Sequence, residues 1–132
     1  MSIEIINSAL QTIASGEKLA LGTINIHKCD GSVVYNGIDT INFRGNGIYQ
    51  IMVKVDGISS TADQLLKVAI AYNGTTSSIA SASAYADATD STYTLVIPKM
   101  IKICGNPLAI TLVNSGATST FYQNLIIDIV RV

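Results

Sequence analysis

The sequence predicts an all-β protein, an antiparallel sandwich or jelly roll of about eight to ten strands, and three observations favour this class. Twenty Ile and nine Val make up 29 of the 132 residues, and these side chains fit the pleated, half-buried surface of a sheet. Short alternating segments are separated by turns rich in Gly, Asn and Asp. No stretch of ten or more residues shows a convincing amphipathic helical pattern.

The first half of the chain supplies five expected strands. Lys18–His27 precedes an Asp-Gly turn, Val33–Tyr35 precedes an Asn-Gly turn, and Asp39–Phe43 precedes a Gly-Asn-Gly turn. Ile48–Asp56 alternates strictly, with an apolar row on one face. Leu66–Asn73 alternates in the same way and ends at Asn-Gly. Each of these segments therefore has a strand pattern and a turn residue that ends it.

The second half is less regular. The Ser- and Ala-rich segment 75–90 is expected to be strand in part, with a mobile loop as the alternative. Thr92–Ile97 is followed by Pro98, which restricts pairing there to a sheet edge or a bulge. The remaining expected strands are Met100–Cys104, Leu108–Asn114, Thr120–Tyr122 and Leu125–Val132.

Size and charge exclude several classes of function. A chain of 132 residues and 13.9 kDa suits one domain. A net charge of −1 provides no basic surface for nucleic acid or anionic membranes. The longest unbroken apolar stretch, Val68–Tyr72, is far shorter than the ~20 residues of a membrane helix. Met1–Ala14 has Glu4 and no Lys or Arg, so a signal peptide is not expected.

The last expected strand is apolar on both faces. Leu125, Ile127 and Ile129 alternate with Ile126, Val130 and Val132, and Leu108–Val113 has a similar pattern. A sandwich strand in a monomer has one dry face and one wet face. Charged residues are only 13% of the chain, too few to cover its surface. These patterns predict an obligate homo-oligomer in which a second copy covers the outer face.

The order of several segments resembles one family. Thr40-Ile41-Asn42-Phe43 followed by Gly47-Ile48-Tyr49-Gln50-Ile51 is similar to an element of the tumour-necrosis-factor-like jelly roll. The segments 68–74, 108–114 and 125–132 resemble later strands of that family, so the likeness spans roughly residues 19–132. The family includes complement-type globular heads, C-terminal domains of collagen-like spore-surface proteins, and small virion proteins of tailed phages.

The resemblance implies a ten-stranded jelly roll that forms a tight homotrimer around a three-fold axis packed by apolar and aromatic side chains. Each candidate for that interface has an ordinary core role as its alternative. The candidates are Tyr49, Phe121, Tyr122, Ile126 and Val130.

The functional expectation follows from this resemblance. Without a collagen-like stalk or a signal peptide, the chain is expected to be a trimeric capsid decoration protein on the surface of a phage virion, made in the host cytoplasm. Residues 1–14 would form an arm that docks on the major capsid protein, and residues 15–132 would form the jelly-roll domain. The expected docking residues are Ile3, Ile5, Ile6 and Leu10.

The alternative is a receptor- or glycan-binding head at a phage fibre tip or on a spore or cell surface. Its binding loops would be Thr75–Asp90 or Ala117–Thr120, with Tyr85 or Tyr122 as an aromatic platform. The chain has no Trp, which ranks this alternative second.

No catalytic, cofactor or metal site is expected. His27 is the only His, and no Gly-x-Ser-x-Gly motif accompanies it. Asp87 and Asp90 fit a solvated loop better than a calcium site. Cys29 and Cys104 are expected to be buried thiols, with a single disulfide as the alternative. Asp128 is expected to pair with an Arg or Lys or to face solvent at the strand edge, and Asn73-Gly74-Thr75 is interpreted as a turn.

Overall fold

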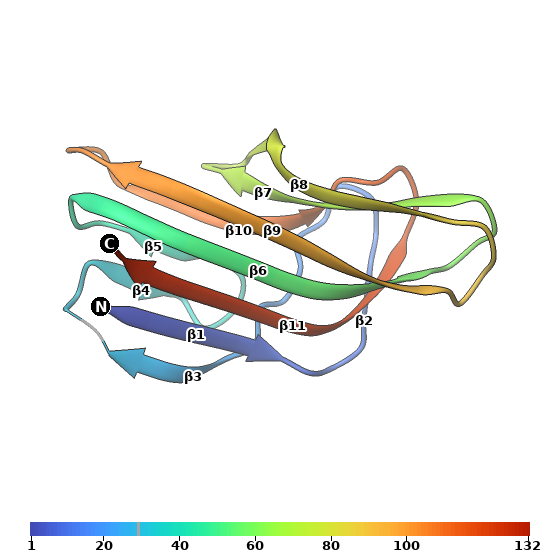
Figure 1. Cartoon of the computed structure of the whole chain (residues 1–132), viewed down its shortest axis with the longest axis horizontal. Helices are drawn as coiled ribbons and strands as arrows, with labels where there is room; N and C mark the ends of the chain where they lie inside the picture. The colour runs from blue at the N-terminus through green and yellow to red at the C-terminus, as the bar shows by residue number, and fades with distance from the viewer. Residues whose placement is uncertain (29) are drawn as a thin grey trace.

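Two antiparallel β-sheets packed face to face make up the chain (Figure 1). The structure is a computed structural model, and it describes residues 1–28 and 30–132 apart from the Ser78 side chain. The strands of the described residues are β1 Ser2–Asn7, β2 Gln11–Ile13, β3 Thr23–Lys28, β4 Val33–Tyr35, β5 Ile41–Phe43, β6 Gly47–Ser59, β7 Gln64–Tyr72, β8 Thr75–Ala86, β9 Thr92–Ile103, β10 Leu108–Asn114 and β11 Thr120–Arg131.

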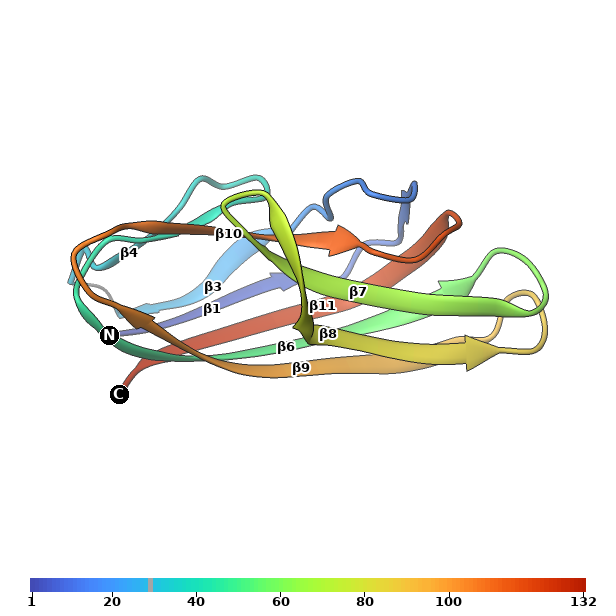
Figure 2. The same ribbon diagram turned by 90° about the horizontal axis from the view of Figure 1, so that it is seen from above.

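The two sheets form the layers of a jelly-roll sandwich. Sheet A has the order β3-β1-β11-β6-β9, with β2 paired to one end of β11, and sheet B has the order β4-β5-β10-β7-β8. Figure 2 shows the layers from above, with β10 in one and β6 and β9 in the other. The predicted all-β class and the antiparallel sandwich architecture are confirmed.

The core lies between the inner faces of the sheets. The predicted apolar row of β6 (Tyr49, Ile51, Val53 and Val55) is fully buried or nearly so. Leu66, Val68 and Ile70 of β7 are buried in the opposite layer. Each aliphatic side chain removed from water in this way stabilises the fold by about 1.5–3 kcal/mol.

Two pairs of expected strands are continuous. β9 joins the expected segments 92–97 and 100–104 through Pro98, which lies opposite Met52. This strand is at the edge of sheet A, where the missing N–H of a proline breaks no ladder on the open side, as predicted. β11 joins 120–122 and 125–132 across a bulge between Gln123 and Ile126.

The structure shortens one expected strand and defines another. The expected strand Lys18–His27 starts only at Thr23, because Gly22 adopts a left-handed φ of +93°. Lys18 instead forms an isolated bridge with Val113. The expected strand in segment 75–90 is confirmed as β8, and its register with β7 breaks between Ala69 and Ala71.

The expected division into an arm 1–14 and a domain 15–132 is corrected. β1 lies inside sheet A, paired to β11 on one side and to β3 on the other. Ile3 and Ile5 are 2% and 0% exposed, so they belong to the core. Alternate apolar residues of this segment therefore complete the sheet, and the segment is part of the single domain.

Replacing Gly22 with Ala should lower the free energy of unfolding by about 2–4 kcal/mol. The added Cβ would overlap the carbonyl oxygen of Ile6 and lie 2.7 Å from Asn7 Cβ, at a backbone angle that favours glycine. Urea denaturation monitored by circular dichroism measures the loss. Gly37→Ala is the control: its φ is +84° but it meets nothing within 4 Å, so it should lose only about 1 kcal/mol. Equal losses would contradict the close packing at Gly22.

Candidate interaction face

The face of sheet A that points away from sheet B carries a continuous set of apolar side chains, which we call outer face A. It combines alternate residues of β1, β11, β6 and β9, and their register places them side by side. Ile6 lies opposite Ile126, and Ile48 and Val132 lie near the chain ends. Its apolar members are Ile6, Ile48, Met52, Val96, Pro98, Met100, Ile126, Val130 and Val132, with Ile58 and Phe121 beyond a polar row of Gln123, Asp56 and Thr94.

Several apolar side chains of outer face A are exposed to solvent in the single chain. Val130 is 47% exposed, Met100 57% and Val96 44%. Soluble monomers rarely display contiguous apolar patches of this kind, and such patches mark interaction sites. Outer face A is therefore the candidate functional site of the chain.

Two carboxyl groups lie side by side within this face. Glu4 of β1 is directly opposite Asp128 of β11. Partial burial, the hydrogen bond to Glu4 and the negative charge of Glu4 raise the pKa of Asp128 to about 6. Hydrogen bonds from Asp128 and from Asn25 lower the pKa of Glu4. One proton is therefore shared between the two carboxyl groups in mildly acidic solution.

The structure divides the predicted trimer-interface residues between core and surface. Ile126 and Val130 lie on outer face A, and Phe121 lies there opposite Ile58, half-buried. Tyr49 and Tyr122 have no exposed surface, so we correct them to core residues. Tyr49 packs edge-on against Phe43, with ring centres 5.1 Å apart, and its hydroxyl donates to the Gly45 carbonyl at 2.6 Å.

The bulge in β11 explains the error at Tyr122. Simple alternation places residues 122, 126 and 130 on one face. The bulge at Asn124, whose φ is +55°, inserts an additional residue and reverses the alternation. Phe121 then shares the face of Ile126, and Tyr122 points into the core, where burial raises its pKa.

The docking residues predicted at the N-terminus are also divided. Ile3 and Ile5 are in the core, and they cannot contact a partner without unfolding β1. Ile6 belongs to outer face A, and Leu10 is 58% exposed between β1 and β2. Met52, Val96 and Met100 were not predicted, although alternation with the buried rows of β6 and β9 was a usable signal.

The remaining candidates from the sequence, His27, Tyr85 and Asn73, lie in ordinary strand or turn positions. His27 is exposed on edge strand β3. Tyr85 is 54% exposed and donates to Asp63 at 2.9 Å. Asn73 accepts a hydrogen bond from the Ala109 amide at 2.9 Å, as a turn residue does. Across residues 1–28 and 30–132, no group of three or more His, Cys, Asp or Glu could hold a metal ion. In the same residues, no helix is long and apolar enough to cross a membrane.

The expectation for the two cysteines is corrected in part. Cys104 is an exposed free thiol that follows edge strand β9, instead of the buried residue expected. Cys29 lies outside the described residues, so the alternative of a disulfide between Cys29 and Cys104 also falls outside them.

Comparison with known proteins relates this arrangement to one fold. No family model matches the sequence, and no curated protein is significantly similar to it. Among solved structures, murine APRIL has a TM-score of 0.72 at 7% identity, over 99% of this chain and 98% of that one. Eiger TNF from S. frugiperda has a TM-score of 0.71 at 10% identity, over 100% and 92%.

The globular domain of zebrafish complement 1qA protein has a TM-score of 0.66 at 5% identity, over 98% of this chain and 94% of that one. At these identities the likeness establishes the fold. The chain has the jelly roll of TNF- and C1q-type domains, as the resemblance implied. The names of these three structures refer to no phage capsid.

Asp128→Asn should raise the stability of the protein at pH 7 by up to about 1 kcal/mol, because it removes one of two like charges that face each other. The pKa of Asp128 is raised from 3.8 to about 6, so the folded chain retains a proton that the unfolded chain loses. Stability should therefore fall as pH rises from about 4 to 6, and the variant should lack this fall. Thermal unfolding between pH 4 and 8 measures it. Parallel pH profiles for variant and parent would contradict the shared proton.

Proposed function

We propose that this protein is a non-enzymatic, homotrimeric head module whose trimer interface covers outer face A. The single observation that carries the proposal is the continuous apolar surface on sheet A, the opposite side from the core. Removing a few hundred Å² of such surface from water stabilises an assembly by several kcal/mol, at ~25 cal/mol per Å². Association through this face therefore has a sufficient driving force.

Further copies of the same chain suit outer face A better than an unrelated partner does. The face combines apolar side chains with charges of both signs, Lys54 beside Ile126 and the pair Glu4 and Asp128. The net charge of −1 adds little repulsion between copies. The likeness to TNF- and C1q-type domains, for which the family resemblance implies a trimer, supports three copies. Sheet B is left facing outward in such an assembly.

A capsid decoration role stays a prediction, together with the major capsid protein as partner and the virion surface as location. The docking arm that motivated it is now a sheet strand. Of the predicted docking residues, Ile6 and Leu10 remain on the surface. Electron microscopy of the source particle tests the prediction by showing whether the chain occupies a three-fold position of a shell.

The trimer should have a molar mass of 41.7 kDa, three times the 13.9 kDa of one chain, by light scattering after gel filtration. Val130→Lys places a charge on outer face A at a site that is 47% exposed in the single chain, so the chain should still fold. In the assembly the same charge would be removed from water, which is unfavourable even beside Asp128, two residues away on the same face. We therefore expect the variant to elute as a 13.9 kDa monomer at micromolar concentration.

Leu65→Lys is the matched control. Leu65 is 51% exposed and lies on the outward face of sheet B, so this variant should remain trimeric. A wild-type chain that stays monomeric at micromolar concentration would contradict the proposal. The same holds if Leu65→Lys dissociates the assembly and Val130→Lys does not, because the interface would then involve sheet B.

A further inference from the structure

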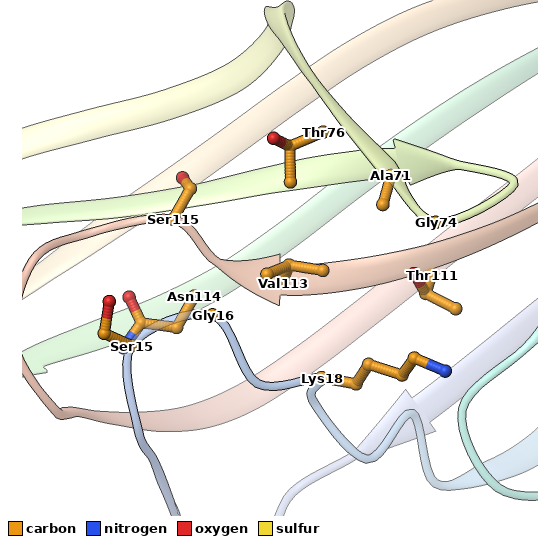
Figure 3. Close-up of a pocket in the computed structure, with 10 residues that line it drawn as sticks. All are labelled: Ser15, Gly16, Lys18, Ala71, Gly74, Thr76, Thr111, Val113, Asn114 and Ser115. Carbon is orange, nitrogen blue, oxygen red and sulfur yellow. The ribbon is translucent and has the colours of Figure 1, made fainter.

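The outward face of sheet B contains two adjoining hollows, which together we call the trough. The first has a volume of about 300 Å³ and lies over β10, β7 and the start of β8, beside the bridge residue Lys18 (Figure 3). The second has a volume of about 310 Å³ and extends along β7 to Lys67. Thr76 and Ser115 line both, so the hollows adjoin each other, and each has one lysine in its lining.

Small residues and a break in β8 create the trough. Thr111 pairs with Ala71 and Val113 pairs with Ala69, so short side chains form the floor. β8 pairs Thr76 with Ala71 and Ser81 with Ala69, so it contains extra residues between two neighbouring pairs. Figure 3 shows β8 leaving β7 beyond Gly74. The bend removes the side chains that would otherwise cover the floor.

Two hydroxyl groups in the trough lack partners. Thr111 is 7% exposed, yet its Oγ1 has no hydrogen-bond partner, and the Oγ of Ser115 is buried without one. A buried hydroxyl without a partner is unfavourable by roughly 1–3 kcal/mol, and most buried polar atoms avoid it. Both residues line the first hollow, so rotation of either side chain would bring its hydroxyl group to the oxygen atoms of a bound molecule.

The neighbouring polar groups are already engaged. Ser15 Oγ donates to the Gly116 carbonyl at 2.6 Å, and the Asn114 amide group bonds to Ile13, Thr118 and Gly116. These bonds fix the wall of the trough. The groups at Thr111 and Ser115 are therefore unsatisfied beside two neighbours, Ser15 and Asn114, that are bonded.

Charge and shape indicate the class of ligand. Among the described residues, no carboxylate and no aromatic ring lines either hollow; Asp63 lines a third hollow, which shares Lys67 and Ser115 with the second. Without a ring to stack on, a neutral sugar lacks the platform that sugar sites use. The ammonium groups of Lys18 and Lys67 favour carboxylate groups on a ligand. The hydroxyl groups of Thr111 and Ser115 can hydrogen-bond to hydroxyl groups of a sugar. The floor of Ala and Val side chains fits the apolar edge of a sugar ring.

We propose that the trough binds an acidic oligosaccharide, with carboxylates at Lys18 and Lys67 and sugar hydroxyls at Thr111 and Ser115. The site lies within one chain, so it forms with or without the trimer. In the proposed trimer it faces outward in three copies, and a multivalent glycan would gain avidity from them. This inference names the ligand class of the proposed head module.

The test uses trigalacturonate as the acidic probe and maltotriose as the neutral one, with calorimetry and NMR of the threonine methyl groups. Trigalacturonate should bind with a Kd below about 1 mM and shift the methyl signals of Thr76 and Thr111. Maltotriose should bind at least about tenfold more weakly, because it lacks carboxylates. Inorganic sulfate and a tetra-aspartate peptide are tested at the same concentration.

Variants separate binding from folding. Lys18→Gln and Lys67→Gln should each weaken trigalacturonate binding about tenfold. Thr111→Val should weaken it severalfold and at the same time raise the melting temperature of the free protein, because it removes an unsatisfied hydroxyl. Lys28→Gln, which changes an exposed lysine on the edge strand β3 of sheet A, is the matched control and should leave binding unchanged.

Several results would overturn the proposal: no shift of Thr76 or Thr111 at about 10 mM trigalacturonate, equal binding of maltotriose, or equal binding to all the lysine variants. Equal or tighter binding of the tetra-aspartate peptide, or the same methyl shifts with sulfate, would assign the trough to a peptide or to a simple anion instead. The titration is repeated with the Val130→Lys variant, which is expected to be a monomer. Loss of ligand binding and loss of trimer formation can then be told apart.

Discussion

The presence of apolar side chains on both faces of β11 governs this structure. This strand occupies the middle of sheet A and is apolar on both sides. Its inward residues Leu125, Ile127 and Ile129 are at most 1% exposed and build the core. Its outward residues continue the apolar surface onto β1, β6 and β9. One side is covered by folding, and the other gives the chain a reason to associate.

The two outward faces of the sandwich consequently differ in chemistry. Outer face A is rich in apolar side chains, and its charged groups include the carboxyl pair Glu4 and Asp128 and the ammonium group of Lys54. The outward face of sheet B is built from small side chains, hydroxyl groups and lysines around the trough. Assembly through the first face leaves the second free for ligands. A jelly roll can thus use one face for oligomerisation and the other for recognition without a second domain. The fold alone does not determine which of these functions a chain has.

Local patterns predicted most of the fold because alternation and turn residues are local signals. The buried row of β6 and the edge position of Pro98 follow from the sequence directly. The bulge at Asn124 did not, because a single left-handed residue reverses the alternation without a distinctive sequence mark. The role of segment 1–14 was missed because a strand completed by a distant partner, here β11, resembles a free arm when its sequence is considered alone.

The trough was also beyond prediction from sequence, since it joins three segments that meet only in the folded chain. Lys18, Thr76 and Ser115 stand far apart in the sequence, and nothing local marks Thr111 as an unsatisfied hydroxyl.

The central claim is that outer face A is covered in an assembly, and methionine oxidation by peroxide tests it most directly. Met52 and Met100 lie on this face and are 37% and 57% exposed in the single chain. We expect both to be protected in the wild-type protein and to be oxidised rapidly in Val130→Lys. Equally rapid oxidation of both methionines in the wild-type protein would contradict this claim.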